Sequence, residues 1–378
     1  MTMIRTTKWI VSSCLLAALV ATTASNAQAA RRPVKNLEFP ATQKEMIENA
    51  WTRDFGTDVA KAIELTEKTF TFVGDNATAK KLRPKFDALK KATGKDTYLK
   101  IRWLRRELIL SHPTLNFDKL LVNKRAPTGY SHQCDQYLGR HARPGAGLTV
   151  VSNWKTEPKA KEILASKLPV GTTLHPDLSY DGKKVMFGYC DATNPKKNER
   201  RYWIWECNVD GSGLKQLTGT KKDGFKTWYG RHTVLVEDWD PCCLPEGGFV
   251  FISTRAQAFG RCHGSRYTPS YLMYRAEADG SNIRQISYGE ANEWDPAVMY
   301  DGRIVYTRWD YINRHDTVFQ SLWSTRPDGT DVKHFYGNYT RNPQMTAEAR
   351  PIPDSEKVVF TAMGHHSYTT GSIVLLDI

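Results

Sequence analysis

The sequence predicts a mainly β protein, namely a β-propeller of four-stranded antiparallel blades. The first observation is a segment in which a residue followed by proline leads through a turn into an apolar run. It occurs four times, at Pro176, Pro241, Pro296 and Pro351, with spacings of 65, 55 and 55 residues. The second is that three of these segments are followed by another unit with its own Asp-Gly turn. Short strands joined by such turns at a fixed period indicate one blade used repeatedly.

The beginning of the chain is typical of a secretion signal, which we place at residues 1–29. Arg5 and Lys8 give it a charged start, a short apolar run follows, and small residues at 27–29 form the cleavage site. The apolar run is too short to span a bilayer. We therefore expect no membrane span and a periplasmic or secreted protein.

Residues 30–115 are predicted to form a small α-helical region. Thr42 and Glu45 have the spacing of a capping box. An apolar stripe at helical spacing follows, and the basic residues away from it are expected on a solvated face. The stripe comprises Tyr98, Ile101, Leu104 and Leu108, and the basic residues are Lys100, Arg102, Arg105 and Arg106.

The propeller is expected to occupy residues 116–378. Strand patterns at 117–124 and 147–153 indicate part of a further blade with weaker repeat features. The last repeat ends inside its second unit, so we expect the sequence to be a fragment of a longer protein.

The net charge of +13 would favour a nucleic-acid partner inside a cell. Export makes a nucleic-acid partner less expected. The basic residues are also scattered along the sequence instead of being gathered among exposed aromatic side chains. We therefore expect no nucleic-acid partner. A protein partner or a small polar ligand is the predicted alternative to a simply solvated surface.

Six of the seven cysteines follow the predicted cleavage site, and an even number in an oxidising compartment permits disulfides. Cys190 ends the second strand of its blade, whereas Cys207 lies well along the third. Antiparallel pairing places these two at opposite ends of a hairpin, beyond the reach of a disulfide. Cys242 and Cys243 share an innermost strand, so alternation should send one thiol towards the channel and the other into the packing between blades.

The connections of a propeller fall on two opposite faces, because strand direction alternates within each blade. One face is predicted to hold the tight Asp-Gly turns, and the other is rich in Cys, His, Arg, acidic and Trp residues. We expect a ligand on this second face. The candidates are His132, Tyr137, Arg261, Glu293, Trp294, Arg308, Trp309 and Asp310. The segment 308–310 also reads as a packing and hydrogen-bonding motif between blades.

Two pairs of residues are candidate metal ligands. Cys262 and His263 offer a thiolate and an imidazole, which suit zinc. His365 and His366 are a second pair, although adjacent histidines at a strand end are often simply polar. The sequence lacks a nucleophile elbow, a zinc-binding His-Glu-x-x-His helix, a phosphate loop and a dinucleotide fingerprint. It also has no Cys-x-x-Cys-His motif for c-type haem, so the cofactor is unknown, with zinc as the candidate.

Ordered motifs over about residues 117–378 resemble the hydrazine synthase alpha-subunit-like family, through its propeller middle domain. The motifs are FDKLLVNKR, SHQCDQY, LHPDLSYDGK, FGRCHG, ANEWDPAV, IVYTRWDY and GNYTRNP. The blades are similar to TolB-type repeats. In the enzyme that names the family, the alpha subunit carries c-type haems and a zinc site beside the catalytic haem. The resemblance implies that Cys262 matches the zinc ligand and that Asp135 matches an acidic catalytic group. The haem-binding segments of that enzyme are absent.

Two functions follow as hypotheses. The first is an exported propeller that acts as a binding or scaffold module, with a polar ligand or a partner on the Cys/His/Arg/Trp-rich face. The second is the propeller part of a metal- or haem-dependent redox enzyme related to hydrazine synthase. A third and weaker one is the regulatory propeller of a serine peptidase whose hydrolase domain lies outside this sequence.

Overall fold

The computed structural model describes residues 42–129, 136–145, 147–219, 226–229, 232–258, 269–310, 320–337, 340–365 and 369–377. The predicted secretion signal lies outside these ranges. By its internal contacts the described chain divides into two compact units. A helical unit contains the residues up to Leu120 together with Val151–Ala160, and a propeller unit contains residues 121–150 and 161–378.

The described part of the helical unit contains four α-helices, which are α1 (Gln43–Phe55), α2 (Val59–Val73), α3 (Ala77–Leu89) and α4 (Gly94–Leu110). The predicted capping box is confirmed at the start of α1, where Thr42 and Glu45 exchange hydrogen bonds. The predicted apolar stripe is buried along α4 and packs against α2 and α3. None of the described helices combines the length and apolarity that a membrane-spanning helix needs.

The predicted solvated face of α4 is wrong in part. Lys100 is exposed and pairs with Asp96. By contrast, Arg105 Nε donates to Thr69 Oγ1 at 3.0 Å, and an Arg106 guanidinium nitrogen donates to the Lys155 carbonyl at 2.9 Å. These two side chains are half-buried because their aliphatic stems pack on the helix surface while the guanidinium groups find partners.

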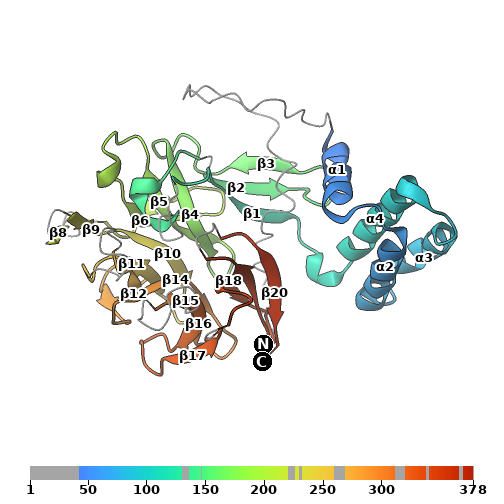
Figure 1. Ribbon diagram of the computed structural model, residues 1–378. Coiled ribbons are helices and arrows are strands. Elements are labelled where there is room, and N and C mark those ends of the chain that lie inside the picture. Colours follow the sequence, from blue (N-terminus) through green and yellow to red (C-terminus); the bar gives the residue numbers. More distant parts are fainter. Residues whose placement is uncertain are drawn as a thin grey trace. The chain divides into compact units, whose positions relative to one another are not determined.

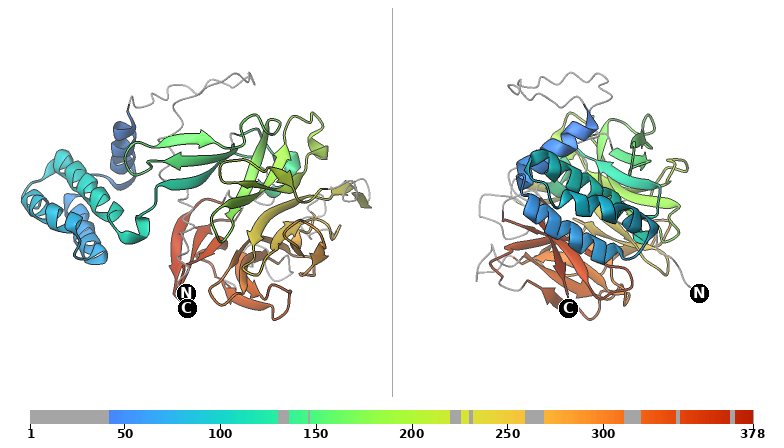
Figure 2. Two further views of the ribbon diagram at one scale, coloured as in Figure 1. Left: turned by 180° about the vertical axis from the view of Figure 1, so that it is seen from behind. Right: turned by 90° about the vertical axis from the view of Figure 1, so that its right-hand side faces the viewer.

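The propeller unit consists of antiparallel blades that follow one another in chain order (Figures 1 and 2). The third and fourth blades are joined into one seven-stranded sheet by a parallel bridge between Gln320 and Met345. The first blade contains β4 (Gly171–Leu178), β5 (Lys184–Asp191), β6 (Tyr202–Asn208) and β7 (Lys215–Gln216). The second contains β10 (Asp238–Cys243), β11 (Phe249–Ser253), β12 (Leu272–Ala276) and β13 (Arg284–Gln285). The third contains β14 (Asn292–Val298), β15 (Ile304–Trp309), β16 (Gln320–Thr325) and β17 (Lys333–Tyr336). The fourth has three described strands, β18 (Met345–Pro351), β19 (Val358–Met363) and β20 (Ser372–Leu376).

The other described strands form two smaller sheets. A three-stranded sheet contains β1 (Lys119–Lys124), β2 (Gly147–Ser152) and β3 (Lys159–Glu162), and a hairpin contains β8 (Lys226–Tyr229) and β9 (His232–Leu235). Strands were predicted at β1 and β2, whereas the hairpin was not foreseen. Four-stranded antiparallel blades confirm the predicted fold class.

The first strands of the four blades, β4, β10, β14 and β18, lie side by side in that order. Each contains a β-bulge near its middle. The residues just before the bulges are fully buried in one hydrophobic cluster, and they are Leu174, Trp239, Trp294 and Ala347. The core of the propeller unit is therefore centred on equivalent positions of its inner strands.

The bulges correct the repeat alignment in the fourth blade. In the first three blades the bulge holds His175, Asp240 and Asp295, each followed by the repeated proline. In β18 the bulge holds Glu348 and Ala349, so Pro351 lies two residues beyond the equivalent position. All four bulge residues have positive φ, between 37° and 57°. Strand pairing, and not the proline, sets the register of the last repeat.

The positions predicted for Cys190 and Cys207 and the divergence of Cys242 and Cys243 are confirmed. Both Cys242 and Cys243 are buried, and a thiol that faces the channel stays a prediction. Cys190 pairs with Tyr202 and Cys207 with Val185, at opposite ends of the β5–β6 hairpin, and both are free thiols. Cys242 lies in the central hydrophobic cluster, whereas Cys243 lies in the cluster between the first and second blades.

Candidate functional site

Four titratable side chains lie at the bulges of adjacent inner strands. We call His175, Asp240, Asp295 and Glu348 the inner-strand cluster. A residue with an L side chain adopts positive φ at a cost of about 1 kcal/mol or more, and bulges commonly re-aim a side chain out of the regular alternation. The repeated bulge therefore holds one side chain from each blade beside its neighbours.

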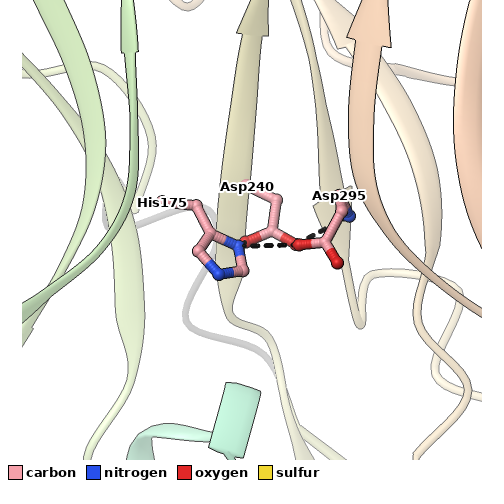
Figure 3. Close-up of side chains that lie close together, drawn as sticks. All are labelled: His175, Asp240 and Asp295. Carbon is pink, nitrogen blue, oxygen red and sulfur yellow. Dashed lines mark hydrogen bonds and ion pairs between the residues drawn. The ribbon is translucent and has the colours of Figure 1, made fainter. Parts of the chain in front are cut away.

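The imidazole of His175 faces two carboxylates (Figure 3). Its Nδ1 shares a short hydrogen bond with Asp240 Oδ1 and lies 3.1 Å from Asp295 Oδ1. The two aspartate side chains are almost fully buried, whereas 19% of the His175 side chain is exposed. The histidine is therefore the most solvent-accessible of the three side chains.

Each aspartate of the cluster is anchored by the backbone of the next blade. Asp240 Oδ2 accepts from the Asp295 amide at 3.1 Å, and Asp295 Oδ2 accepts from the Glu348 amide at 3.0 Å. Glu348 Oε2 accepts in turn from the Thr361 hydroxyl at 3.3 Å. One oxygen of each aspartate is thus held in place, and the other is directed at His175.

One oxygen of the cluster lacks a hydrogen-bond donor. A single Nδ1–H can serve one carboxylate well, and Asp240 receives it. Asp295 Oδ1 is buried and has no hydrogen-bond donor among the described residues. A buried carboxylate oxygen without a donor is costly.

Burial and neighbouring charges shift the pKa values of the cluster. Burial alone would lower the pKa of His175, but Asp240 and Asp295 outweigh it and raise the pKa to about 9. Burial raises the pKa of Asp295 to about 7, against the opposing charges of His175 and Arg350. Paired shifts of this kind are frequent at functional sites.

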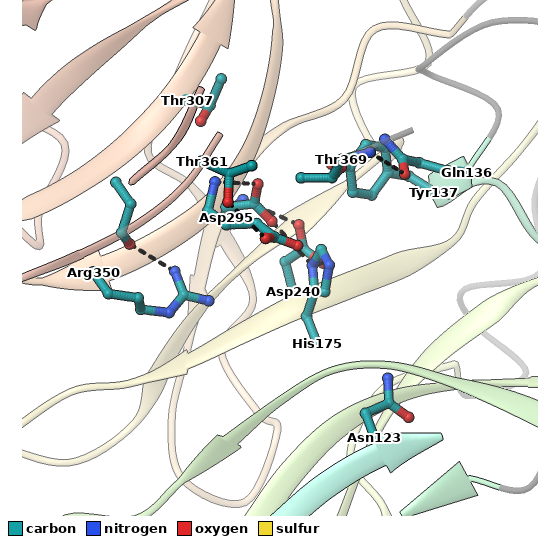
Figure 4. A network of polar contacts seen from close by, with 12 residues as sticks. Asn123, Gln136, Tyr137, His175, Asp240, Asp295, Thr307, Arg350, Thr361 and Thr369 are labelled. Carbon is teal, nitrogen blue, oxygen red and sulfur yellow. Dashed lines mark hydrogen bonds and ion pairs between the residues drawn. The ribbon is translucent and has the colours of Figure 1, made fainter. Parts of the chain in front are cut away.

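Tyr137 covers the cluster and was among the predicted ligand residues. Its ring stacks on Trp294 at 5.6 Å between centroids and meets the His175 ring edge-on at 5.7 Å. Its hydroxyl lies 3.4 Å from Thr369 Oγ1 (Figure 4). The side chain is fully buried, and burial together with Asp295 and Asp240 holds its pKa well above the usual range.

The other predicted ligand residues that are described gather at one end of the third blade. Arg308 lies opposite Glu293 in the strand register, and its Nε donates to Asp310 Oδ1 at 2.8 Å. The Trp309 ring meets the His365 ring edge-on at 5.3 Å. Trp294 and Trp309 are fully buried core residues, so packing accounts for their positions and their contact with a ligand stays a prediction.

The remaining predicted site residues lie outside the described ranges. They are the catalytic candidate Asp135, the ligand candidates His132 and Arg261, and the metal candidates Cys262, His263 and His366. The roles proposed for them stay predictions.

Sequence reasoning missed the inner-strand cluster. Its signal was present, because the residue before the repeated proline is titratable in the first three repeats. Equivalent positions of adjacent blades lie side by side on the inner strands, so a titratable residue repeated there predicts a cluster.

A second buried carboxylate lies at Glu237, just before β10. Its Oε2 accepts from the amides of Gly139 at 2.8 Å and Tyr202 at 3.3 Å. Burial raises its pKa to about 7, although these two amides oppose the rise. Because the folded protein holds this proton more tightly than the unfolded chain, the contribution of Glu237 to stability is full at low pH and is lost as the pH rises through about 7.

Titration of Glu237 should lower the unfolding free energy of the wild type as the pH rises from 5 to 8. We expect this decrease to be smaller in Glu237→Gln, by about 2–3 kcal/mol. Urea unfolding at both pH values measures it. Glu199→Gln, at an exposed position, is the control and should leave the pH dependence as it is. An unchanged loss in Glu237→Gln would show that this carboxyl titrates near its ordinary pKa.

Comparisons with known proteins show similarity of fold. No protein-family model and no curated protein sequence matches the chain. Among solved structures it is similar to a TolB protein from Agrobacterium tumefaciens, with 13% identity, a TM-score of 0.43, and coverage of 68% of this chain and 80% of that one. It is also similar to hydrazine synthase from Kuenenia stuttgartiensis, with 18% identity, a TM-score of 0.47, and coverage of 69% and 37%. Oligogalacturonate lyase in complex with manganese gives 16% identity, a TM-score of 0.35, and coverage of 69% and 62%.

The two resemblances noted in the sequence, to TolB-type repeats and to hydrazine synthase, thus recur among solved structures. At these identities the similarity concerns the fold. The chemistry of the chain has to be argued from its own residues.

Proposed function

We propose that this protein is an exported ligand-binding β-propeller that takes a cation at the inner-strand cluster. The observation that carries the proposal is the set of three carboxyl groups around one imidazole, with Asp295 Oδ1 buried and lacking a donor among the described residues. A buried carboxylate oxygen without a hydrogen-bond donor is costly. A bound cation would supply the missing partner.

The ligand set favours a cation with more than one charge. Two aspartate oxygens and one imidazole nitrogen converge within 4.8 Å of one another. Sites that combine carboxylates with an imidazole are typical of divalent ions. The competing interpretation is that protonated His175 only cross-links the blades, and buried ion pairs are weak sources of net stability.

Two further parts of the proposal come from the sequence. Export rests on the signal-like residues 1–29. The predicted polar face, with the partly exposed pair Arg308 and Asp310 at one end of the third blade, is where a protein partner or a larger polar ligand would bind. Glu293 is buried, and its carboxylate accepts from Met273 N and Ser287 Oγ. The redox-enzyme alternative depends on Asp135, Cys262 and His263, and it stays a prediction.

Equilibrium dialysis of the chelator-treated full chain tests the cation site. With Mg²⁺, Ca²⁺, Mn²⁺ and Zn²⁺ offered separately, we expect at least one to bind with one ion per chain. Asp295→Asn should abolish that binding, whereas Asp377→Asn, at an exposed position, should retain it. Failure of every cation to bind at millimolar concentration would refute the proposal.

A further inference from the structure

We infer that the cation bound at the inner-strand cluster is a divalent first-row transition metal ion, such as Mn²⁺ or Zn²⁺, and not Ca²⁺ or Mg²⁺. Its ligands are His175 Nδ1, Asp240 Oδ1 and Asp295 Oδ1. This inference rests on the cation site proposed above and names the class of ion that the site selects.

The three ligand atoms are close enough for one ion. All lie within 4.8 Å of one another, and Nδ1 of His175 is 3.1 Å from Asp295 Oδ1. Metal–ligand bonds of about 2.0–2.2 Å to nitrogen and carboxylate oxygen place neighbouring ligand atoms roughly 3 Å apart. The contact between His175 and Asp240 lengthens when an ion enters, because the ion replaces the proton that these two atoms share.

The surroundings hold the ligands in place before an ion arrives. The Oδ2 atom of each aspartate accepts a hydrogen bond from a backbone amide of the next blade. The Oδ1 atom of each aspartate is therefore the one that can bind the ion. Outer contacts of this kind orient metal ligands and contribute to affinity.

An independent observation points to a missing ligand at the cluster. The Asp295 side chain has no exposed surface, and its Oδ1 has no hydrogen-bond donor among the described residues. This oxygen faces Nδ1 of His175 at 3.1 Å (Figure 3). An ion there would compensate it.

The ligand types select the class of ion. Ca²⁺ and Mg²⁺ prefer sites made of oxygen atoms, whereas one imidazole with carboxylates suits Mn²⁺, Fe²⁺ or Zn²⁺. His175 binds as the neutral imidazole, and its proton is released to solvent. Solvent can fill the remaining coordination positions.

Competition titrations of the chelator-treated full chain test the inference. We expect Mn²⁺ or Zn²⁺ to bind at least about tenfold more tightly than Ca²⁺ or Mg²⁺. His175→Gln should remove this preference and leave any weak Ca²⁺ or Mg²⁺ binding unchanged. His334→Gln, on the outermost strand of the third blade, and Cys262→Ala are controls that should keep the preference.

Electron spin-echo spectroscopy of bound Mn²⁺ gives a second readout that needs no cluster variant. Modulation from an imidazole ¹⁴N nucleus is expected in the wild type. The inference is overturned if that modulation is missing, if Ca²⁺ binds as tightly as Mn²⁺ and Zn²⁺, or if Cys262→Ala removes the ion while His175→Gln keeps it. Tight Ca²⁺ binding would leave the proposed cation site standing, whereas absence of all cation binding would remove both.

Discussion

Asp238→Ala is expected to lower the free energy of unfolding by about 3–5 kcal/mol. Asp238 and Arg255 form a two-pronged ion pair, with Arg255 Nε 3.0 Å from Oδ1 and a terminal nitrogen 2.6 Å from Oδ2. The side chains are 0% and 9% exposed. Ser253 Oγ also donates to Asp238 at 2.6 Å. Truncation leaves a buried guanidinium facing a cavity, which is why the cost is large.

Urea unfolding at pH 7 measures this cost, with the slope of the transition as a check on two-state behaviour. The control is Asp377→Ala, which breaks an exposed pair with Lys357 whose side chains are 69% and 42% exposed. Exposed pairs contribute about 0–1 kcal/mol. If Asp238→Ala were no more costly than this control, the buried pair would not be stabilising the second blade.

Asp240→Ala in the metal-free protein is expected to cost about 3–5 kcal/mol as well. This carboxylate is the partner of His175 and also the acceptor for the Asp295 amide. Its removal takes the acceptor away from His175 Nδ1 and from the Asp295 amide. It also removes one of the two carboxylates that raise the pKa of His175.

A double-mutant cycle with His175→Gln separates the ion pair from the backbone contact. We expect the double variant to be less destabilised than the sum of the single variants, by about 1–3 kcal/mol. Asp301→Ala, in the exposed turn at the other end of the third blade, is the matched control and should cost less than about 1 kcal/mol. Additive effects of Asp240→Ala and His175→Gln would contradict the coupling that the short contact implies.

The blades could be predicted because their determinants are local. Asp-Gly turns and the repeated proline fix where each hairpin begins, and strand alternation then fixes which end of a blade each connection leaves from. The same reasoning placed Cys190 and Cys207 at opposite ends of one hairpin and sent Cys242 and Cys243 to different clusters.

The inner-strand cluster depends on contacts between blades, and the sequence shows such contacts only indirectly. Alignment on proline placed Arg350 at the fourth equivalent position, but the pairing of β18 with β19 puts the bulge at Glu348. The basic residues of α4 were misjudged for a related reason. Their partners, Thr69 and Lys155, lie far away in the chain, and helical periodicity carries no information on them.

The location of the ion is tested most directly by anomalous X-ray scattering from crystals of the full chain grown with Mn²⁺ or Zn²⁺. We expect one peak among His175, Asp240 and Asp295, about 2.0–2.2 Å from Nδ1 of the histidine. A peak beside His365 or Cys262 with nothing at the inner strands, or no peak at all, would contradict the account.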